Sequence, residues 1–594
     1  MTQPIPSASI MRLVQGFWRH LSLRRKHQLS ILMLLMVCSS FAEVLSLGAV
    51  LPFLGVLTTP DKVLHIALIQ PVLHWLDIHT AEQLLLPVTS VFILAVLLAG
   101  GMRLLMLYVS TRLSFAISAD FSYEVYRRTL YQPYLAHVSR NSSEIINGIT
   151  NKVGLILSGL LMPLLTLISS VLMLGSILVA LMAINPVMSL AAFLGFGVIY
   201  GVVMFVMKRR LAENSERVSL EGPRVIQALQ EGLGGIRDVL IDGSQLSYCG
   251  AYRNADVPLR HAQASSLFIA GAPRFAAEAL GIAFIAILAY VLAMQEGGVA
   301  NAITTLGALA LGAQRMLPLL QQGYQALVSI RSSQHSLGDA LSLLGQPIDA
   351  SVYQENATTT LSFERGIQLE GVGFRYAAEG ANVLRDINLN LPCGHRIGFI
   401  GTTGSGKSTL LDVIMGLLPP TEGRILIDGV PLQSENLRVW QRRIAHVPQA
   451  IYLSDSSISE NIAFGVPARK IDMTRVKKAA RQAQICDYIE SLPDGYSTHV
   501  GERGVRLSGG QRQRIGIARA LYKQAQVIIF DEATSALDND TERAIMDAID
   551  SLDRNLTILM IAHRLSTLER CDQVIEIGKG RIVQITDYRN IIQN

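Results

Sequence analysis

The apolar residues of this chain are concentrated before about Arg331, in runs that are long enough to cross a membrane. A transmembrane helix needs about 20 predominantly apolar residues. Six stretches meet that length, at 29–57, 84–111, 155–184, 187–207, 264–294 and 299–328. After Arg331 the apolar density falls and polar residues become frequent. The pattern predicts an all-α membrane domain of six helices, followed by a separate domain.

The polar segments between these runs divide the chain further. A basic segment precedes the first run, and we expect residues 10–27 to form an interfacial helix with Phe17 and Trp18 on the membrane side. Gly345, Pro347 and a polar run at 354–360 are typical of a linker. The expected division is a basic N-terminal segment at 1–28, a transmembrane domain at 29–334, a linker at 335–362 and a C-terminal domain at 363–594.

The basic residues indicate the orientation of the membrane domain. Lys and Arg are frequent before the first run, between the second and third, and between the fourth and fifth. The opposite loops contain little more than Lys62. By the positive-inside rule, both termini and the C-terminal domain are expected in the cytoplasm. The two long inside segments have polar residues at helical spacing, which favours cytoplasmic helical extensions over irregular loops.

Composition supports a membrane protein. Half of the 594 residues are hydrophobic and only 16% are charged, and the mean hydropathy is +0.36. An ordinary soluble protein is less apolar. The net charge of +5 is explained by basic cytoplasmic loops, so no nucleic-acid partner is expected. The cysteines lack the spacing of a metal site and are expected to be free thiols: Cys38, Cys249, Cys393, Cys486 and Cys571.

The C-terminal half contains a phosphate-binding loop. A strand-like run at 396–400 leads into GTTGSGKST, which fits the pattern G-x-x-x-x-G-K-[ST]. Its glycines let backbone N–H groups approach phosphates, Lys407 supplies charge, and Ser408 is expected to be a Mg²⁺ ligand. The expected ATP-binding residues of this loop are Gly401, Thr402, Thr403, Gly404, Ser405, Gly406, Lys407, Ser408 and Thr409.

A second strand-like run, at 527–530, is followed by two carboxylates. Asp531 is expected to hold Mg²⁺ through water, and Glu532 to orient or deprotonate the attacking water. Phosphoryl transfer requires mainly such positioning and charge neutralisation. The two motifs together predict ATP and Mg²⁺ as cofactors.

The motifs around these carboxylates resemble those of ABC transporters. LSGGQ at 507–511 resembles the ABC signature, SALD at 535–538 the D-loop, and GERG at 501–504 a loop of exporters. The resemblance implies an α/β P-loop ATPase domain of the ABC type, with Glu532 and His563 as catalytic residues and Gln449 as a further metal ligand. It also implies that these residues bind ATP: Tyr376, Gln449, Ser508, Gly509, Gly510, Gln511 and Asp538.

The same resemblance implies a dimer. In this family two ATPase domains close head-to-tail, so that each ATP lies between the Lys407 loop of one chain and Ser508, Gly509 and Gly510 of the other. The chain has one copy of each motif and cannot complete a site alone. A homodimer is the simplest closure, and a heterodimer is the alternative. Fusion of the membrane domain ahead of the ATPase resembles exporters rather than importers.

Four ionisable residues interrupt the apolar runs and are the candidate substrate residues: Glu43, Arg103, Arg274 and Arg315. At about 1.5 Å per helical residue, the three arginines lie roughly 24–30 Å from the outer ends of their helices. Arginines at one depth could bind a phosphate or pyrophosphate headgroup. Alternatively, they snorkel, pair with Glu43 or bind ordinary anionic lipid.

The segments at 41–54, around Arg274 and around Arg315 resemble flippases of lipid-linked oligosaccharides in bacterial protein glycosylation, as does the apolar external segment 61–78. Gln322 stands where that resemblance would place another basic residue. The resemblance implies a polyprenyl-pyrophosphate glycan as substrate, moved from the inner to the outer leaflet of a bacterial cytoplasmic membrane. The alternatives are an exporter of other lipids, glycolipids or hydrophobic drugs, and an ATP-gated channel or regulator.

Overall fold

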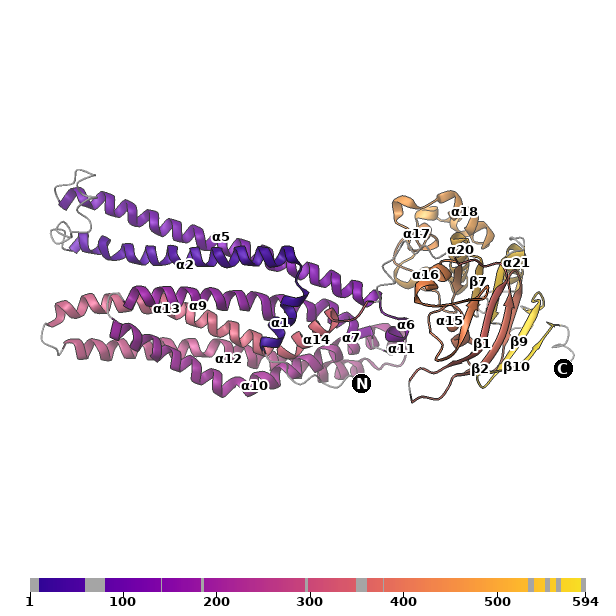
Figure 1. Ribbon diagram of the computed structural model, residues 1–594, viewed down its shortest axis with the longest axis horizontal. Helices are drawn as coiled ribbons and strands as arrows, with labels where there is room; N and C mark the ends of the chain where they lie inside the picture. Colours follow the sequence, from indigo (N-terminus) through magenta and orange to yellow (C-terminus); the bar gives the residue numbers. More distant parts are fainter. Residues whose placement is uncertain are drawn as a thin grey trace. The chain divides into compact units, whose positions relative to one another are not determined.

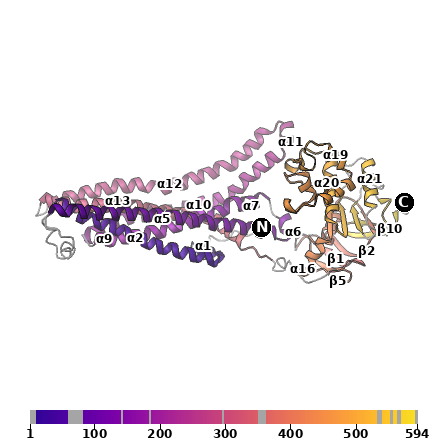
Figure 2. The same cartoon turned by 90° about the horizontal axis from the view of Figure 1, so that it is seen from above.

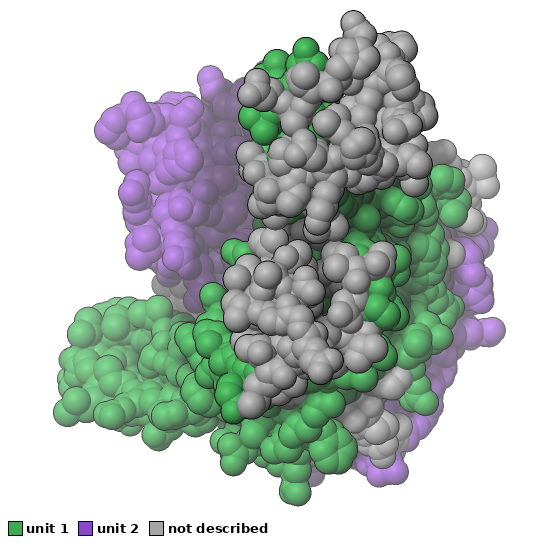
Figure 3. Space-filling model, turned by 90° about the vertical axis from the view of Figure 1, so that its left-hand side faces the viewer, with its two compact units in different colours: residues 1–132, 140–347 green, residues 133–139, 348–594 purple. Residues whose placement is uncertain are grey.

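The structure is a computed structural model that describes residues 10–58, 81–139, 142–182, 186–293, 298–348, 361–377, 379–531, 539–550, 556–561 and 568–588. The chain divides into two compact units (Figure 3). Unit 1 contains Met1–Gln132 and Arg140–Pro347, and unit 2 contains Pro133–Ser139 and Ile348–Asn594. The external segment predicted at 61–78 lies outside the described residues.

Unit 1 is helical. Its long helices are α2 (Leu23–Thr58), α5 (Ala81–Leu130), α9 (Met162–Met182), α10 (Pro186–Gly234), α12 (Gln245–Ala293) and α13 (Gly298–Ser332). Over the described residues, five of the six predicted apolar runs lie in single helices, the run at 264–294 as far as Ala293. The run at 155–184, as far as Met182, covers the end of α8 (Val153–Leu155), the π-helical η2 (Ile156–Leu161) and α9.

The long helices pack in pairs, α2 with α5, α9 with α13 and α10 with α12 (Figure 1). Towards the ends connected by residues 59–80, α2 and α5 lie apart from the other four helices. Helices α10 and α12 run side by side and are connected through α11 (Ile236–Ile241) (Figure 2). The apolar side chains of α2, α5 and η2 meet in a core that includes Leu32, Ile117 and Leu160.

Three of these helices continue well beyond their apolar runs, into segments that the sequence predicts to be helical extensions. Helix α5 ends at Leu130, α10 ends at Gly234, and α12 begins at Gln245. Ion pairs at helical spacing support the extensions, including Arg209 with Glu213 at 3.1 Å and Arg260 with Asp256 at 3.1 Å. Such pairs between neighbouring turns stabilise exposed helices.

By length and composition, three helical stretches among the described residues could cross a membrane. They are Leu23–Val50, Gln83–Leu130 and Ile145–Ala180. In the most apolar part of Gln83–Leu130 only 11% is buried inside the chain. Burial of apolar area is the main driving force of folding in water. The uncovered face of α5 therefore requires lipid or a second chain as its neighbour.

Two segments differ from the sequence prediction. Phe17, expected on the membrane side, is 2% exposed and packs edge-to-face on Phe121 of α5, with ring centroids 5.6 Å apart. Helix α1 (Ile10–His20) thus directs Phe17 into the core of unit 1, while Trp18 remains 47% exposed. Most of α14 (Gln334–Leu344) falls in the predicted linker, but its Leu337, Ala340 and Leu344 are buried in that core. Apolar residues at helical spacing explain this packing.

Unit 2 contains two sheets. An antiparallel sheet has the order β2-β1-β4-β5, with strands β1 (Gly366–Phe374), β2 (Leu384–Pro392), β4 (Glu422–Ile427) and β5 (Val430–Pro431). A second sheet has the order β10-β9-β3-β8-β7-β6, with β3 (Arg396–Ile400), β6 (Ile444–Val447), β7 (Val527–Asp531), β8 (Thr557–Ile561), β9 (Gln573–Gly578) and β10 (Arg581–Thr586). The neighbouring pairs from β9 to β6 are parallel, and β10 is antiparallel.

The parallel sheet has continuous apolar strands in its core, and the helices of unit 2 pack on it or on one another. All five residues of β8 are buried, as expected for a strand with both faces covered. The helices are α15 (Lys407–Ile414), α16 (Ser434–Arg442), α17 (Ile458–Ile462), α18 (Met473–Gln482), α19 (Cys486–Ser491), α20 (Gly509–Lys523) and α21 (Asn539–Asp550). Trp440 of α16 is fully buried and donates to the carbonyl oxygen of Ile414 at 2.8 Å, which fixes α16 against α15.

Candidate ATP site

The carboxyl ends of the parallel strands bring the predicted ATP-site residues to one edge of the sheet. The phosphate-binding loop follows β3, Gln449 lies two residues beyond β6, and Asp531 is the last residue of β7. Ile561 of β8 pairs in register with Phe399 of β3 and with Asp531. In open α/β sheets, ligands bind in the crevice outside these strand ends. His563 follows Ile561 by two residues but lies outside the described residues.

The glycines of the loop are required by its backbone. Gly401 has φ +142° and a Cβ there would overlap the carbonyl oxygen of Ile577. Gly406 has φ +104° and a Cβ would lie 3.0 Å from Cδ2 of Leu384 and 3.2 Å from the oxygen of Val383. Gly404 has φ +79°, a value that only glycine adopts at little cost. Without side chains at these three positions, the backbone N–H groups of the loop can approach a bound phosphate closely.

The surroundings of Lys407 and Ser405 show whether the loop fits a triphosphate. Lys407 begins α15, is 7% exposed, and its Nζ donates to the carbonyl oxygens of Gly401 at 2.9 Å and Thr402 at 3.0 Å. The N-terminus of α15 adds the positive end of the helix dipole. Ser405 is 2% exposed, and among the described residues its Oγ has no hydrogen-bond partner. A buried cation, a helix start and an unpartnered hydroxyl fit the phosphates of ATP.

Tyr376 is placed beside this loop by β1. Its hydroxyl lies 3.2 Å from Oγ1 of Thr409, and its ring meets Phe374 edge-to-face at 4.9 Å. The ring is 45% exposed. Phe374 and Thr409 hold the ring in position, and its open area is available for stacking on a base.

Ser408 and Thr409 lie in the first turn of α15, Thr402 and Thr403 are exposed on the loop, and Gln449 is exposed beyond β6. Hydroxyl, amide and carboxylate oxygens suit Mg²⁺. Ser408, Gln449 and Asp531 would therefore hold the ion, with ATP supplying the phosphoryl group. The catalytic candidate Glu532 and the D-loop residue Asp538 lie outside the described residues, so their roles stay predictions.

A further acid near this edge was missed by the sequence analysis. Asp412 of α15 is half-buried, and burial raises its pKa to about 6, with the charge of Asp531 adding to the shift. Neither the loop motif nor the strand motif includes this position. Only packing brings it into electrostatic range of Asp531.

Replacing Asp412 by asparagine is expected to change the pH dependence of stability. The folded pKa of about 6 lies above the ordinary value of 3.8, so the folded state binds the proton more tightly and wild-type stability falls as pH rises from about 4 to 6. After discounting for solvent, we expect Asp412→Asn to melt roughly 2–4 °C higher than wild type at pH 7.5. At pH 4 the difference should vanish. Thermal unfolding of nucleotide-free protein tests this, with exposed Asp455→Asn as control; a pH-independent difference would contradict it.

The predicted signature begins at the N-terminus of α20. Ser508 caps the helix: its Oγ accepts from the N–H of Gln511 at 3.2 Å, and Oε1 of Gln511 accepts from the N–H of Ser508 at 2.7 Å. Gly509 and Gly510 form the first turn, where N–H groups have no partner within the helix. The side chain of Gln511 is therefore engaged in its own helix start, and it positions Ser508 and the two glycines.

Helix α20 is attached to the segment that follows Gln449. A Cβ at Gly516 would lie 2.5 Å from Cδ1 of Ile451, so this glycine makes room for Ile451. Arg519 donates to the carbonyl oxygens of Asn461 and Tyr452, both at 3.0 Å. Burial lowers the pKa of Arg519 to about 10, which leaves it protonated at neutral pH. The segment that begins at Ile451, two residues after Gln449, is therefore held directly against α20.

A short helix from between α5 and α7 (Ser142–Asn147) belongs to unit 2. This is α6 (Tyr134–Val138), whose Leu135 packs on the core that contains the apolar side chains of α15. Burial raises the pKa of Tyr134, and the charges of Asp412 and Tyr376 add to the shift. Helix α6 therefore lies close to the adenine side of the candidate ATP site, a contact that the sequence analysis did not predict.

The four ionisable candidates in the membrane helices are not equivalent. Glu43 of α2 is 2% exposed and forms an ion pair with Arg103 of α5. Arg274 of α12 pairs with Glu278 one turn later, with 2.7 Å between Nε and Oε1. The side chain of Arg315 lies outside the described residues. Glu278 was missed in the sequence, although its spacing of four from Arg274 on a helix was a usable signal.

The sequence matches two families. Residues 29–306 match the family described as ABC transporter transmembrane region, and residues 384–535 match the family described as ABC transporter. The chain is 31% identical to the ATP-dependent lipid A-core flippase of Cupriavidus metallidurans, over 82% of this chain and 81% of that protein. It is 35% identical to the protein of that name from Chromohalobacter salexigens, over 66% and 67%.

A third relative and one solved structure extend over nearly the whole chain. The heterocyst differentiation ATP-binding protein HepA of Nostoc sp. is 30% identical over 97% of this chain and 95% of its own length. The structure of a bacterial Atm1-family ABC exporter with ATP bound superimposes with a TM-score of 0.77, covering 96% of both chains at 23% identity. The predicted fold class, a six-helix membrane domain followed by an α/β P-loop ATPase domain, is confirmed.

Proposed function

This chain belongs to the ABC transporters, in the exporter type that fuses the membrane and ATP-binding domains, and from that premise we propose that it is a glycolipid flippase. It hydrolyses ATP, with Mg²⁺ as the metal, and couples hydrolysis to transport across the membrane. The proposed direction is from the inner to the outer leaflet of a bacterial cytoplasmic membrane, with the ATPase domain and both termini in the cytoplasm.

The observation that carries this proposal is the similarity to lipid A-core flippases over most of both chains. Features of the membrane helices support it. Helix α5 has an almost uncovered apolar face, while ion pairs interrupt the apolar runs at Arg103 and Arg274. Ionised groups in membrane helices are costly and mark pathways for polar groups. Lipid-facing helices with polar interruptions suit a substrate that has acyl chains and a polar headgroup.

A polyprenyl-pyrophosphate oligosaccharide is the second candidate substrate. The segments around Arg274 and Arg315 and at 41–54 favour it through their resemblance to oligosaccharide flippases. The pairing of Arg103 and Arg274 with carboxylates weighs against it, because a pyrophosphate requires cations with little competition from neighbouring acids. An ATP-gated channel or regulator is disfavoured by the presence of the hydrolysis residues Glu532 and His563.

We infer that the working unit is a homodimer. The chain has one phosphate-binding loop and one Ser508 segment, so a second copy must supply the opposite half of each ATP site. A symmetric dimer completes both ATP sites at once, because each chain supplies the missing half of the other chain's site. Within unit 2, α6 packs beside the candidate site and the segment after Gln449 is attached to α20.

Lipid translocation in proteoliposomes tests the proposal. The purified protein is reconstituted with one of three labelled lipids: a lipid A-core glycolipid, a polyprenyl-pyrophosphate oligosaccharide or phosphatidylethanolamine. We expect ATP with Mg²⁺ to move the lipid A-core probe at several times the rate seen with ADP, and faster than phosphatidylethanolamine.

Glu532→Gln serves as the inactive control in the same liposomes. Faster movement of the polyprenyl probe would identify the second candidate as the substrate. If no probe moved with ATP while hydrolysis was normal, the flippase proposal would be wrong.

A further inference from the structure

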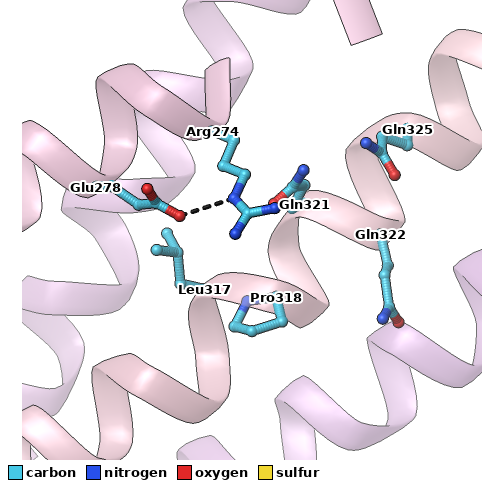
Figure 4. A pocket seen from close by; sticks show the side chains of 7 residues that line it. All are labelled: Arg274, Glu278, Leu317, Pro318, Gln321, Gln322 and Gln325. Carbon is cyan, nitrogen blue, oxygen red and sulfur yellow. Dashed lines mark hydrogen bonds and ion pairs between the residues drawn. The ribbon is translucent and has the colours of Figure 1, made fainter. Parts of the chain in front are cut away.

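A pocket of about 320 Å³ lies between α12 and α13 in the membrane unit (Figure 4). Its volume is at the lower end of the range for small-molecule sites. The lining is polar for a membrane domain and consists of Arg274, Glu278, Leu317, Pro318, Gln321, Gln322 and Gln325. The guanidinium of Arg274 lies between the carboxylate of Glu278 and the amide of Gln321.

The charges in the pocket cancel. Arg274 and Glu278 form an ion pair at 2.7 Å, and their side chains are 53% and 39% exposed. The other polar lining groups are the amides of Gln321, Gln322 and Gln325, which are uncharged. A phosphate entering here would meet Glu278 as well as Arg274, and like charges repel at this range. The pocket is therefore poorly suited to an anion.

The lining groups instead match hydroxyls. Each glutamine amide offers two N–H donors and a carbonyl acceptor, and a sugar hydroxyl both donates and accepts. The paired Arg274 and Glu278 add further donors and acceptors to the same wall, and Leu317 and Pro318 provide an apolar surface. Arg274, Glu278 and Gln321 lie close together, while Gln322 points away from them (Figure 4). A few polar groups on an apolar background are typical of a specific binding site.

Tyr200 of α10 supports this interpretation independently. It is 6% exposed, and among the described residues its hydroxyl has no hydrogen-bond partner. It lies close enough to Arg274 and Glu278 to interact electrostatically with both. Its ring packs on Tyr324 of α13, with centroids 5.3 Å apart. Buried hydroxyls normally have a partner, so the unpartnered Tyr200 hydroxyl marks a polar spot at the junction of α10, α12 and α13, behind the Arg274–Glu278 pair that lines the pocket.

The pocket also lies near the depth of an inner-leaflet headgroup. Arg274 is 20 residues from the outer end of the apolar run 264–294, and Gln322 is 23 residues from the outer end of 299–328. At about 1.5 Å per residue these positions are roughly 30–35 Å from the outer ends, which is close to the hydrocarbon thickness of about 30 Å. A headgroup presented from the inner leaflet can reach the pocket while its acyl chains stay in lipid.

We propose that this pocket binds an uncharged, hydroxyl-rich saccharide unit of a lipid headgroup through the glutamine amides of α13. The proposal rests on the proposed function, since it names the part of a glycolipid that this site recognises. The site differs from a phosphate site in the groups that contact the ligand. The amides of Gln321 and Gln325 bind the sugar hydroxyls, and the Arg274–Glu278 pair orients the amide of Gln321.

Lipid binding without ATP tests this pocket separately from transport. Native mass spectrometry of the purified dimer would measure apparent Kd for three lipids with identical acyl chains: a monoglucosyl-diacylglycerol, diacylglycerol and phosphatidic acid. We expect the glucosyl lipid to bind at least about tenfold more tightly than diacylglycerol, because several hydrogen bonds are gained. Gln321→Leu/Gln325→Leu should lose about tenfold of that affinity.

The charge-free variant Arg274→Gln/Glu278→Gln separates sugar from phosphate recognition. It should keep glucosyl-lipid affinity within about threefold, since donors and acceptors remain. Gln314→Leu, an exposed change on the same helix outside the pocket, should leave every affinity unchanged. If the double leucine variant does not fold, Gln325→Leu alone, at an exposed position, should still weaken the glucosyl lipid by about threefold.

Two results would overturn the proposal. If phosphatidic acid bound most tightly and lost its affinity in the charge-free variant, the pocket would be a phosphate site. If the leucine variants bound the glucosyl lipid like wild type, the saccharide would be recognised elsewhere. Neither result depends on lipid translocation. If the protein moves lipid A-core probes with ATP but shows either of these binding results, only the pocket proposal is wrong. If it binds the glucosyl lipid as expected but moves no probe, only the flippase proposal is wrong.

Discussion

Replacing Glu532 by glutamine is expected to leave ATP binding intact and to reduce hydrolysis at least about 100-fold. The carboxylate follows Asp531 at the edge where the parallel strands end, and its predicted role is to orient or deprotonate water. Lys407 and the loop glycines, which are predicted to hold the phosphates, are unchanged in this variant. The amide keeps the size of the side chain and removes only its basicity. Phosphate release and retention of labelled ATP, measured on the same preparation, test both halves of the prediction.

The matched control is Glu569→Gln, which changes an exposed carboxylate of the same unit and should hydrolyse ATP like wild type. Because hydrolysis is blocked after binding, Glu532→Gln should also accumulate a closed dimer with ATP and Mg²⁺, visible by cross-linking. Hydrolysis within a few-fold of wild type would show that another group activates the water.

Mixing Lys407→Ala chains with Ser508→Arg chains is expected to restore ATPase activity that neither variant has alone. Lys407 belongs to the loop after β3, and Ser508 caps α20, which lies much later in the sequence of the same domain. In a head-to-tail dimer the mixed pair has one intact composite site and one with both defects. Each pure variant has two damaged sites. If the sites act independently, an equal mixture should recover about a quarter of wild-type activity.

Differently tagged chains allow the mixed dimer to be isolated, so its formation is measured apart from its activity. Mixing two differently tagged Lys407→Ala chains controls for any ATPase activity that arises from subunit exchange alone. This mixture should recover no ATPase activity. Mixed dimers that form but stay inactive would exclude a site shared between the Lys407 loop and Ser508.

The sequence was sufficient for most features that depend on local order along the chain. Apolar runs of membrane length predicted the long helices α2, α5, α9, α10, α12 and α13, because a segment in lipid must satisfy its backbone hydrogen bonds internally as a helix. The phosphate-binding loop was equally predictable. Its glycines, Lys407 and Ser408 must follow one another at set spacing for the loop to close on phosphates, and the positive φ values at Gly401, Gly404 and Gly406 agree with this requirement.

Tertiary structure decided which residues meet. Local pattern marked Arg103 and Arg274 as costly cations but could not select among a phosphate site, snorkelling and pairing. Packing placed Glu43 against Arg103, and a charged pair in a poorly hydrated site is far cheaper than either ion alone. The raised pKa of Asp412 and the docking of α6 on unit 2 likewise arise between segments far apart in sequence. The sequence by itself thus determined the long membrane helices, the phosphate-binding loop and the family. The partners of its charges followed only from the folded chain, because burial and Coulomb energy depend on distances in space.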